Sequence, residues 1–211
     1  MPPEVTVVDY GMGNVASVMR ALCACGAAPT LTGVPEQVAS ASRLILPGVG
    51  AFADGVEELR RRALIEPIHA FARAGRPFLG ICLGMQMMLA TGEEFGVVAG
   101  LGLIAGNVHA IQGPRKIPHV GWNRISPWGK AMDWQGTILE GIGRDDAVYF
   151  VHSYAASPQL PSDVLAECDY DGYRFAAVIR SGNLYGCQFH PEKSGPIGLR
   201  ILNSFLKASG S

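Results

Sequence analysis

The segment Gly80-Ile81-Cys82-Leu83-Gly84 places a nucleophilic side chain between two glycines. The apolar run from Pro77 to Ile81 predicts a strand before Cys82, and residues 83–89 predict a helix after it. A sharp turn from strand to helix exposes such a side chain at the end of a sheet, where crowded backbone favours flanking glycines. The positive end of the helix would favour a thiolate, so Cys82 is a candidate nucleophile. A small buried apolar residue is the alternative reading of a lone cysteine.

A histidine and a carboxylate follow another apolar run close to the C-terminus. His190 comes directly after residues 184–189, and Glu192 stands two positions later. Side chains two apart in an extended segment point to the same side, so the Glu192 carboxylate can orient the imidazole and stabilise its protonated form. Together with Cys82 the pair would make a nucleophile, a base and an orienting acid. An exposed histidine beside a solvated glutamate is the plainer alternative.

Two further features could serve the same chemistry. Gln86 lies one helical turn after Cys82, so its amide could bind a polar substrate beside the sulfur. The segment Pro47-Gly48-Val49-Gly50 ends another predicted strand, residues 43–46, and its backbone N–H groups could stabilise an oxyanion. A glycine-rich segment can also be a simple turn.

Cofactor and metal sites are not indicated. Gly11, Gly13 and Ala16 have the spacing of a dinucleotide-binding turn, but no acidic residue follows at a second strand end about 20 positions on. The histidines, cysteines and acidic residues show no spacing typical of metal ligands. We therefore expect no cofactor and no metal.

The elements around these motifs predict an α/β fold. The first 90 residues repeat strand, glycine-containing turn and helix, which is typical of a parallel sheet covered by helices. Predicted strands are residues 4–9, 43–46 and 77–81, and predicted helices include 15–22 and 52–63, with a new helix starting at Pro67. In the second half, residues 147–151, 175–179 and 184–189 predict strands added to this sheet, residues 126–146 a loop, and residues 196–207 a final helix. We expect one domain over residues 1–211.

Composition excludes several classes of function. The 211 residues are 48% hydrophobic and 17% charged, with a formal net charge of −1, which offers no basic footprint for nucleic acid or an anionic membrane. The N-terminus lacks the basic leader of a signal peptide, and no apolar run is long enough for a membrane span. Five cysteines without a CxxC pair do not suggest a disulfide framework. These features predict a cytoplasmic protein.

Taken together, Gly80-Ile-Cys82-Leu-Gly84-Met-Gln86 and Gln188-Phe-His190-Pro-Glu192 closely resemble the two active-site motifs of the class I, or triad, glutamine amidotransferases. Further segments are similar to those of the glutaminase subunits of imidazole glycerol phosphate synthase, an enzyme of histidine biosynthesis. They are Asp9-Tyr-Gly-Met-Gly-Asn14, Pro47-Gly-Val-Gly-Ala-Phe52, Pro118-His-Val-Gly-Trp-Asn123, Tyr149-Phe-Val-His-Ser-Tyr154 and His190-Pro-Glu-Lys-Ser194. The resemblance implies a three-layer, flavodoxin-like α/β fold with a mostly parallel central sheet and added antiparallel strands.

The resemblance also implies hydrolysis of L-glutamine to glutamate and ammonia through a cysteinyl thioester. Cys82 would attack the side-chain amide, His190 would transfer protons, Glu192 would orient His190, and the N–H groups of Val49 and Gly50 would form the oxyanion hole. The residues implied to hold glutamine are Gly48, Gln86, Glu94, Ser153 and Tyr154. Glu93 is adjacent to Glu94, so the register of this loop stays open.

Ammonia released in this way needs a dry path to an acceptor, because in water at neutral pH it is mostly protonated. A chain of this length leaves no room for a second, barrel-sized enzyme, so the resemblance implies a heterodimer with a separate cyclase subunit. That subunit would make imidazole glycerol phosphate and aminoimidazole carboxamide ribotide, and its ligand would stimulate the glutaminase by completing the oxyanion hole. The positions implied to face it are Asn14, Trp122, Asn123, Tyr149 and Lys193.

Three alternatives remain at this stage. The chain could be the amidotransferase subunit of another biosynthetic pathway, although the Pro47–Gly50 and Pro118–Asn123 segments argue against this. It could be a Cys-dependent hydrolase of the same fold that acts without a partner. It could also be a binding module without catalysis, against which the complete set Cys82, His190 and Glu192 argues.

Overall fold

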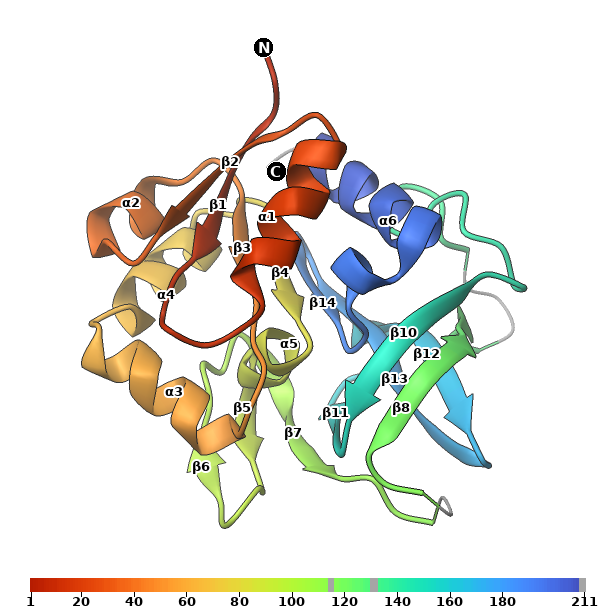
Figure 1. The fold of residues 1–211 in the computed structure, drawn as a ribbon. Coiled ribbons are helices and arrows are strands. Elements are labelled where there is room, and N and C mark those ends of the chain that lie inside the picture. The colour runs from red at the N-terminus through yellow and green to blue at the C-terminus, as the bar shows by residue number, and fades with distance from the viewer. Residues whose placement is uncertain (114–115, 130–132, 209–211) are drawn as a thin grey trace.

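A mixed sheet forms the centre of the computed structural model, which describes residues 1–113, 116–129 and 133–208 (Figure 1). Within these residues the sheet has eight strands, in the order β2-β1-β3-β4-β14-β13-β12-β9. In that order the strands are Ala28–Thr32, Glu4–Val8, Leu44–Leu46, Phe78–Ile81, Leu184–Cys187, Tyr173–Ser181, Val164–Tyr170 and Ser126–Pro127. The strands from β2 to β14 pair in parallel, whereas β13, β12 and β9 add antiparallel pairs. This arrangement confirms the predicted fold class.

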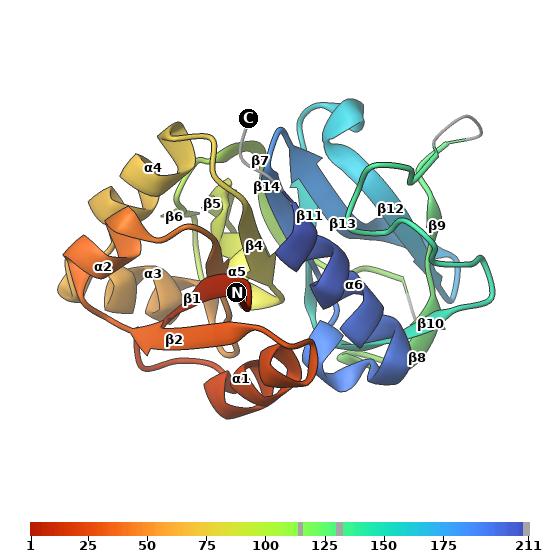
Figure 2. The same ribbon diagram turned by 90° about the horizontal axis from the view of Figure 1, so that it is seen from above.

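Helices cover both faces of the parallel half, which explains why β3 and β4 are buried along their whole length. On one face α1 (Val15–Ala24) and α6 (Gly195–Lys207) pack together, and their residues share an apolar core with alternate residues of β1. On the other face lie α2 (Pro35–Ser40), α3 (Phe52–Arg61) and α4 (Ile65–Arg73), which share a second core (Figure 2). The short helix α5 (Leu83–Met87) follows β4.

Two smaller sheets lie beside the central one. β8 (His119–Arg124) pairs with β10 (Ala147–His152), and the four remaining strands form a second small sheet. Those strands are β11 (Tyr154–Pro158), β7 (Ile104–Ala110), β5 (Leu89–Gly92) and β6 (Val98–Ala99). The prediction that residues 147–151 join the central sheet was therefore wrong, although they do form a strand. An apolar run rich in β-branched and aromatic residues indicates a strand but does not specify its partner, which is set by contacts with distant segments.

Other differences from the prediction are local. The sequence analysis did not predict β2 or α2. β2 is an edge strand that is mostly exposed and contains a proline. Helix α4 begins at Ile65, so Pro67 lies inside its first turn, where a backbone N–H has no partner within the helix. The helix after Cys82 ends at Met87 instead of continuing to Leu89. The predicted loop 126–146 consists mostly of turns where it is described, and its residues 130–132 lie outside the described residues.

Short 3-10 helices complete the described elements. They cover Pro161–Asp163 and Pro191–Lys193, and the second of these carries Glu192. No helix in the described ranges combines the length and the apolar character needed to cross a membrane.

Candidate active site

Cys82 occupies a strained turn between β4 and α5. Its backbone has φ +54° and ψ −109°, a region that L-residues rarely adopt and that costs on the order of 1–3 kcal/mol. The turn is held on both sides, because Cys82 N donates to Cys187 O over 2.7 Å and Cys82 O accepts from Gln86 N over 3.1 Å. Strain that the surrounding structure maintains in this way is typical of an activated nucleophile.

The flanking glycines have the steric role that the sequence predicts. A Cβ added at Gly80 would lie 2.7 Å from Met85 N, and one added at Gly84 would overlap the carbonyl oxygen of Leu46. Both neighbours are backbone atoms that cannot move aside without shifting β3 or α5. The close approach of α5 to β3 and β4 therefore depends on these two glycines.

A cavity of about 370 Å³ opens beside Cys82. It is lined by residues from five separate segments of the chain, so the fold assembles it from distant parts of the sequence. The lining comprises Val49, Gly50, Cys82, Leu83, Gln86, Glu94, Val151, His152, Ser153, Tyr154 and Lys193. Most of the residues expected to hold glutamine or an oxyanion thus meet in one place. Larger hollows elsewhere on the described surface do not include Cys82.

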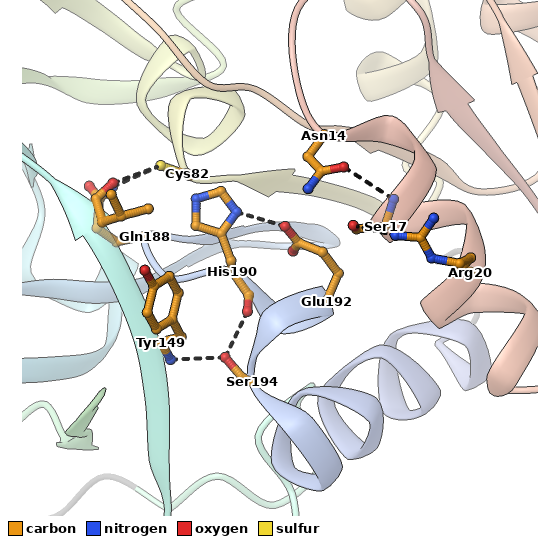
Figure 3. A network of polar contacts seen from close by, with 10 residues as sticks. Asn14, Ser17, Arg20, Cys82, Tyr149, Gln188, His190, Glu192 and Ser194 are labelled. Atoms are coloured by element: carbon orange, nitrogen blue, oxygen red, sulfur yellow. Dashed lines mark hydrogen bonds and ion pairs between the residues drawn. The ribbon is translucent and has the colours of Figure 1, made fainter. Parts of the chain in front are cut away.

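His190 and Glu192 form a buried pair behind Cys82. The imidazole Nδ1 lies 2.7 Å from the Glu192 Oε1, and the two side chains are 2% and 1% exposed. Figure 3 shows the ring between Cys82 and Glu192. In the described part of the chain the other ring nitrogen, Nε2, is buried without a hydrogen-bond partner, so it is free to give or take a proton at the sulfur or at a substrate.

The charges around His190 favour its protonated form. Burial by itself would lower the pKa of His190, but the Cys82 sulfur and the Glu192 carboxylate both stabilise the imidazolium and together raise the pKa to about 9. At neutral pH the ring therefore carries a proton that a leaving group can take. Above pH 9 this proton is lost.

This pKa predicts an alkaline limit to catalysis that depends on Glu192. The glutaminase activity that the resemblance implies should fall as pH rises through about 9, because the neutral ring cannot protonate a leaving ammonia. Glu192→Gln removes a charge that favours the imidazolium, so the alkaline limb should move to lower pH while the maximal rate falls roughly 10²- to 10⁴-fold. Rate profiles of the chain with the cyclase subunit that the resemblance implies would measure both effects.

A matched control is Glu93→Gln, which removes a carboxylate from an exposed residue that bonds Asn107 and does not line the cavity. It should leave the alkaline limb in place. An unchanged limb in Glu192→Gln as well would mean that the Glu192 carboxylate does not set the protonation of His190.

Two glutamine side chains extend the network around the sulfur. Gln86 Nε2 donates to Tyr154 O over 2.9 Å and to Gln188 Oε1 over 3.1 Å, and Gln188 Nε2 donates to Cys82 Sγ over 3.8 Å. Both N–H groups of Gln86 are thus occupied, which leaves its Oε1 to accept from a ligand in the cavity. Gln188 had no role in the sequence analysis, although its position two residues before His190 in the segment Gln188-Phe-His190 is a signal that could have indicated one.

The C-terminal end of the Pro47–Gly50 segment reaches the cavity. Val49 is 40% exposed and lines the cavity together with Gly50, whose φ of +113° favours glycine. Gly48 is buried instead, and a Cβ there would lie 2.5 Å from the Tyr10 hydroxyl. That hydroxyl donates to Pro47 O over 2.8 Å. The structure therefore places Gly48 as a packing residue under the segment, outside the cavity lining, and Tyr10 as its anchor.

The structure settles the register of the acidic loop. Glu94 lines the cavity, and its Oε2 accepts from Phe52 N over 2.8 Å at the start of α3. Glu93 is exposed and bonds Asn107 instead. Glu94 is thus the carboxylate available to a cationic group in the cavity.

Three of the five residues expected at a partner interface gather on one surface. The rings of Trp122 and Tyr149 meet edge to face with centroids 6.0 Å apart, and Lys193 Nζ lies 5.9 Å from the centre of the Tyr149 ring. Asn14 caps α1, where its Oδ1 accepts from Ser17 N over 3.3 Å. Asn123 is half-buried: its side chain contacts His119, and the residue also lines a surface hollow beside Trp122, so its expected place at a partner interface stays a prediction.

Ser194 is a further residue that the sequence analysis missed. Its hydroxyl donates to His190 O over 2.7 Å and accepts from Tyr149 N over 3.0 Å, and the residue is 1% exposed. It thereby ties the backbone of His190 to β10, as Figure 3 shows. Local sequence carries no signal for this role, because Tyr149 lies in a distant segment.

Comparisons with known proteins agree with this geometry. The chain is 52% identical to "Imidazole glycerol phosphate synthase subunit HisH 1" of Legionella pneumophila (strain Lens), covering 97% of this chain and 99% of that protein. It is 47% identical to "Imidazole glycerol phosphate synthase subunit HisH" of Rhodopirellula baltica, covering 97% of each chain. These relatives extend over nearly the whole sequence.

The fold is shared with solved structures of lower identity. "Structure of PurLQS from Thermotoga maritima" superposes with a TM-score of 0.74 at 20% identity and 98% coverage of both chains. The family model described as "Glutamine amidotransferase class-I" matches residues 6–208. The chain therefore belongs to the class I glutamine amidotransferase family.

Proposed function

We propose that this chain is the glutaminase subunit of an imidazole glycerol phosphate synthase in histidine biosynthesis, and that it hydrolyses L-glutamine to glutamate and ammonia. The observation that carries the chemistry is the strained Cys82 at the cavity wall with the buried His190–Glu192 pair behind it. The relatives in Legionella and Rhodopirellula support the pathway, because both are named as subunits of that synthase. We place the reaction in the cytoplasm.

The reaction divides into two acyl transfers. The Cys82 sulfur attacks the side-chain amide carbon of glutamine, and the resulting tetrahedral oxyanion is stabilised by the N–H groups of Val49 and Gly50. His190 passes its proton from Nε2 to the amide nitrogen, and ammonia leaves a glutamyl thioester on Cys82. His190, now neutral, removes a proton from water, which attacks the thioester and releases glutamate and the thiolate. Glu192 holds the ring in one tautomer through both steps.

Polar groups around the cavity match the ends of a glutamine molecule. Glu94 supplies a carboxylate for the α-ammonium group, and Gln86 Oε1 can accept a hydrogen bond. Ser153 and Tyr154 also line the cavity. A cavity of about 370 Å³ accommodates an amino acid of this size.

The surface next to the cavity suits a protein partner. We define the docking face as Val120, Trp122, Tyr149, Val151 and Lys193. Val120 and Trp122 are 51% and 56% exposed on β8, where they pair with Val151 and Tyr149 of β10. Val151 and Lys193 also line the cavity, so a cyclase subunit seated on this face would receive ammonia without passage through bulk water. Contact near Lys193 could also act on the Pro47–Gly50 segment across the cavity.

The test is a glutaminase assay of this chain alone, with the cyclase subunit, and with the cyclase subunit and its phosphoribulosyl aminoimidazole carboxamide ligand. We expect low turnover for the chain alone and a rise of at least about tenfold in the loaded complex. Substantial turnover without the partner would instead favour a partner-independent hydrolase. Stimulation by a synthase subunit of another pathway would contradict the assignment to histidine biosynthesis.

A further inference from the structure

Two buried histidines outside the catalytic pair contact each other beside the cavity. His119 on β8 and His152 at the end of β10 are 2% and 7% exposed, and His119 Nδ1 lies 3.1 Å from His152 Nε2. His119 Nε2 lies 3.2 Å from Asn123 Nδ2, and His152 Nδ1 lies 2.9 Å from Tyr154 O. All four ring nitrogens therefore have a partner, and neither ring is needed for the proton transfers assigned to His190.

The partners at the two ends fix the direction of every hydrogen bond. A carbonyl oxygen only accepts, so His152 Nδ1 carries a hydrogen and donates to Tyr154 O. In a neutral ring His152 Nε2 is then an acceptor, which requires His119 Nδ1 to donate to it. His119 Nε2 in turn accepts from the amide of Asn123. The chain of donors runs one way, from Asn123 to the Tyr154 carbonyl, with both histidines in the Nδ1–H tautomer.

The surroundings keep both rings neutral. Burial lowers the pKa of His119 to about 4 against the opposing charge of Asp171. Burial also lowers the pKa of His152 to about 3, and neighbouring His119 and His190 add to this effect, while the bond to Tyr154 O opposes it. A proton added to either ring would set two N–H groups against each other. His119 is further confined between the rings of Phe150 and Tyr170, at centroid distances of 4.8 and 3.9 Å.

The hydrogen-bond chain ends at the Tyr154 carbonyl, where the backbone passes from one sheet to another. Between His152 and Tyr154 the polypeptide leaves the β8–β10 sheet and enters the sheet of β11 and β7. The Tyr154 carbonyl accepts from two side chains there, His152 Nδ1 and Gln86 Nε2, each over 2.9 Å. Gln86 continues through Gln188 to the Cys82 sulfur. The cavity wall at residues 153–154 is thus held from both sides.

We propose that His119 and His152 are positioning residues, whose one-way hydrogen-bond chain holds the Tyr154 carbonyl and so shapes the wall of the glutamine pocket. The inference deepens the proposed function and rests on it for the identity of the ligand. The hydrogen-bond chain itself can be tested without any assay of activity.

The first test is the tautomeric state of the two rings in the wild-type chain. Long-range ¹H–¹⁵N correlation spectra should show both histidines with a protonated Nδ1 and an unprotonated Nε2, unchanged between about pH 6 and pH 8. A protonated Nε2 on either ring, or titration of either ring in this range, would overturn the proposal. This result is independent of glutamine turnover.

The second test separates positioning from packing. His119→Phe keeps the ring between Phe150 and Tyr170 but deletes two hydrogen bonds, so in the stimulated complex KM for glutamine should rise about tenfold with kcat changed less than about threefold. His119→Asn restores a donor near the position of Nδ1 and should recover most of the loss. Tyr170→Phe is the control, because it keeps the stacked ring and removes only the hydroxyl that bonds Lys116 O.

A lowered melting temperature in His119→Phe with KM unchanged would mean that the pair serves stability alone and would overturn the proposal. Synthesis from ammonium salts by the complex should be unaffected in each variant, because the cyclase is intact. If wild-type chain and partner show no glutaminase activity, the proposed function fails, while the tautomer measurement still decides whether the hydrogen-bond chain exists.

Discussion

Cys82→Ala, combined with the cyclase subunit, is expected to abolish synthesis from glutamine while leaving synthesis from ammonium salts nearly intact. In the proposed mechanism the sulfur forms the covalent bond to the glutamyl group, and Cys82 is the one cysteine among the described residues that line the cavity. The loss should be on the order of 10⁴-fold or more, since removal of a nucleophile disables the whole triad. Parallel assays with glutamine and with ammonium chloride measure the two activities on the same complex.

Cys23→Ala provides the thiol control, because Cys23 is exposed on α1 and does not line the cavity. Both activities should survive that change. Equal loss of the two activities in Cys82→Ala would indicate that Cys82 supports the assembly of the complex and not the attack on glutamine. Retained glutamine-dependent synthesis would remove Cys82 as the nucleophile.

Gly84→Ala is expected to lower the stability of the chain strongly. The added Cβ would overlap Leu46 O and lie 2.8 Å from Leu46 C, so α5 and β3 could not keep their present separation. Overpacking against backbone should lower the free energy of unfolding by about 3 kcal/mol. In a chain of this size that corresponds to a melting temperature lower by roughly 6–12 °C, measurable by calorimetry.

Gly143→Ala is the matched control. Gly143 is exposed and its φ lies outside the positive region, and an added Cβ there would meet the Asp146 carboxylate at an ordinary 3.7 Å. Its free energy of unfolding should change by less than about 0.5 kcal/mol. A Gly84→Ala chain as stable as this control would show that the elbow tolerates a side chain and that the packing argument is wrong.

Local pattern was sufficient for the elements that alternate strand, turn and helix. The spacing of apolar residues predicted β1, β3 and β4, and also the helices α1 and α3 that follow β1 and β3, because a buried parallel sheet requires continuous apolar strands. It was insufficient for β2, an exposed edge strand with a proline, and for the sheet to which β10 belongs. Partner choice depends on contacts between distant segments, which no local window contains.

For the site, too, local pattern predicted some features and could not predict others. The types and spacing of Gly80, Cys82 and Gly84, and of His190 and Glu192, predict a nucleophile at an elbow and a base with its orienting acid, and the structure has the strained turn at Cys82 and the buried His190–Glu192 pair. The distance between the two groups follows from the parallel pairing of β4 with β14, which places both segments at one end of the sheet. Asn123 shows the limit of local reasoning, because its neighbour Trp122 is exposed while its own side chain points inward to His119.

By itself, the sequence determined which residues can do chemistry here, because a strained elbow, a two-residue offset and a helical turn are short-range geometries encoded in adjacent positions. Only the tertiary structure decided which of Glu93 and Glu94 faces the cavity, that Gly48 packs beneath Tyr10, and that His119 and His152 bond each other. These outcomes depend on burial and on hydrogen bonds between segments far apart in the chain. Such contacts form only when the sheets and helices pack together, and that packing turns a set of reactive side chains into a cavity of defined shape.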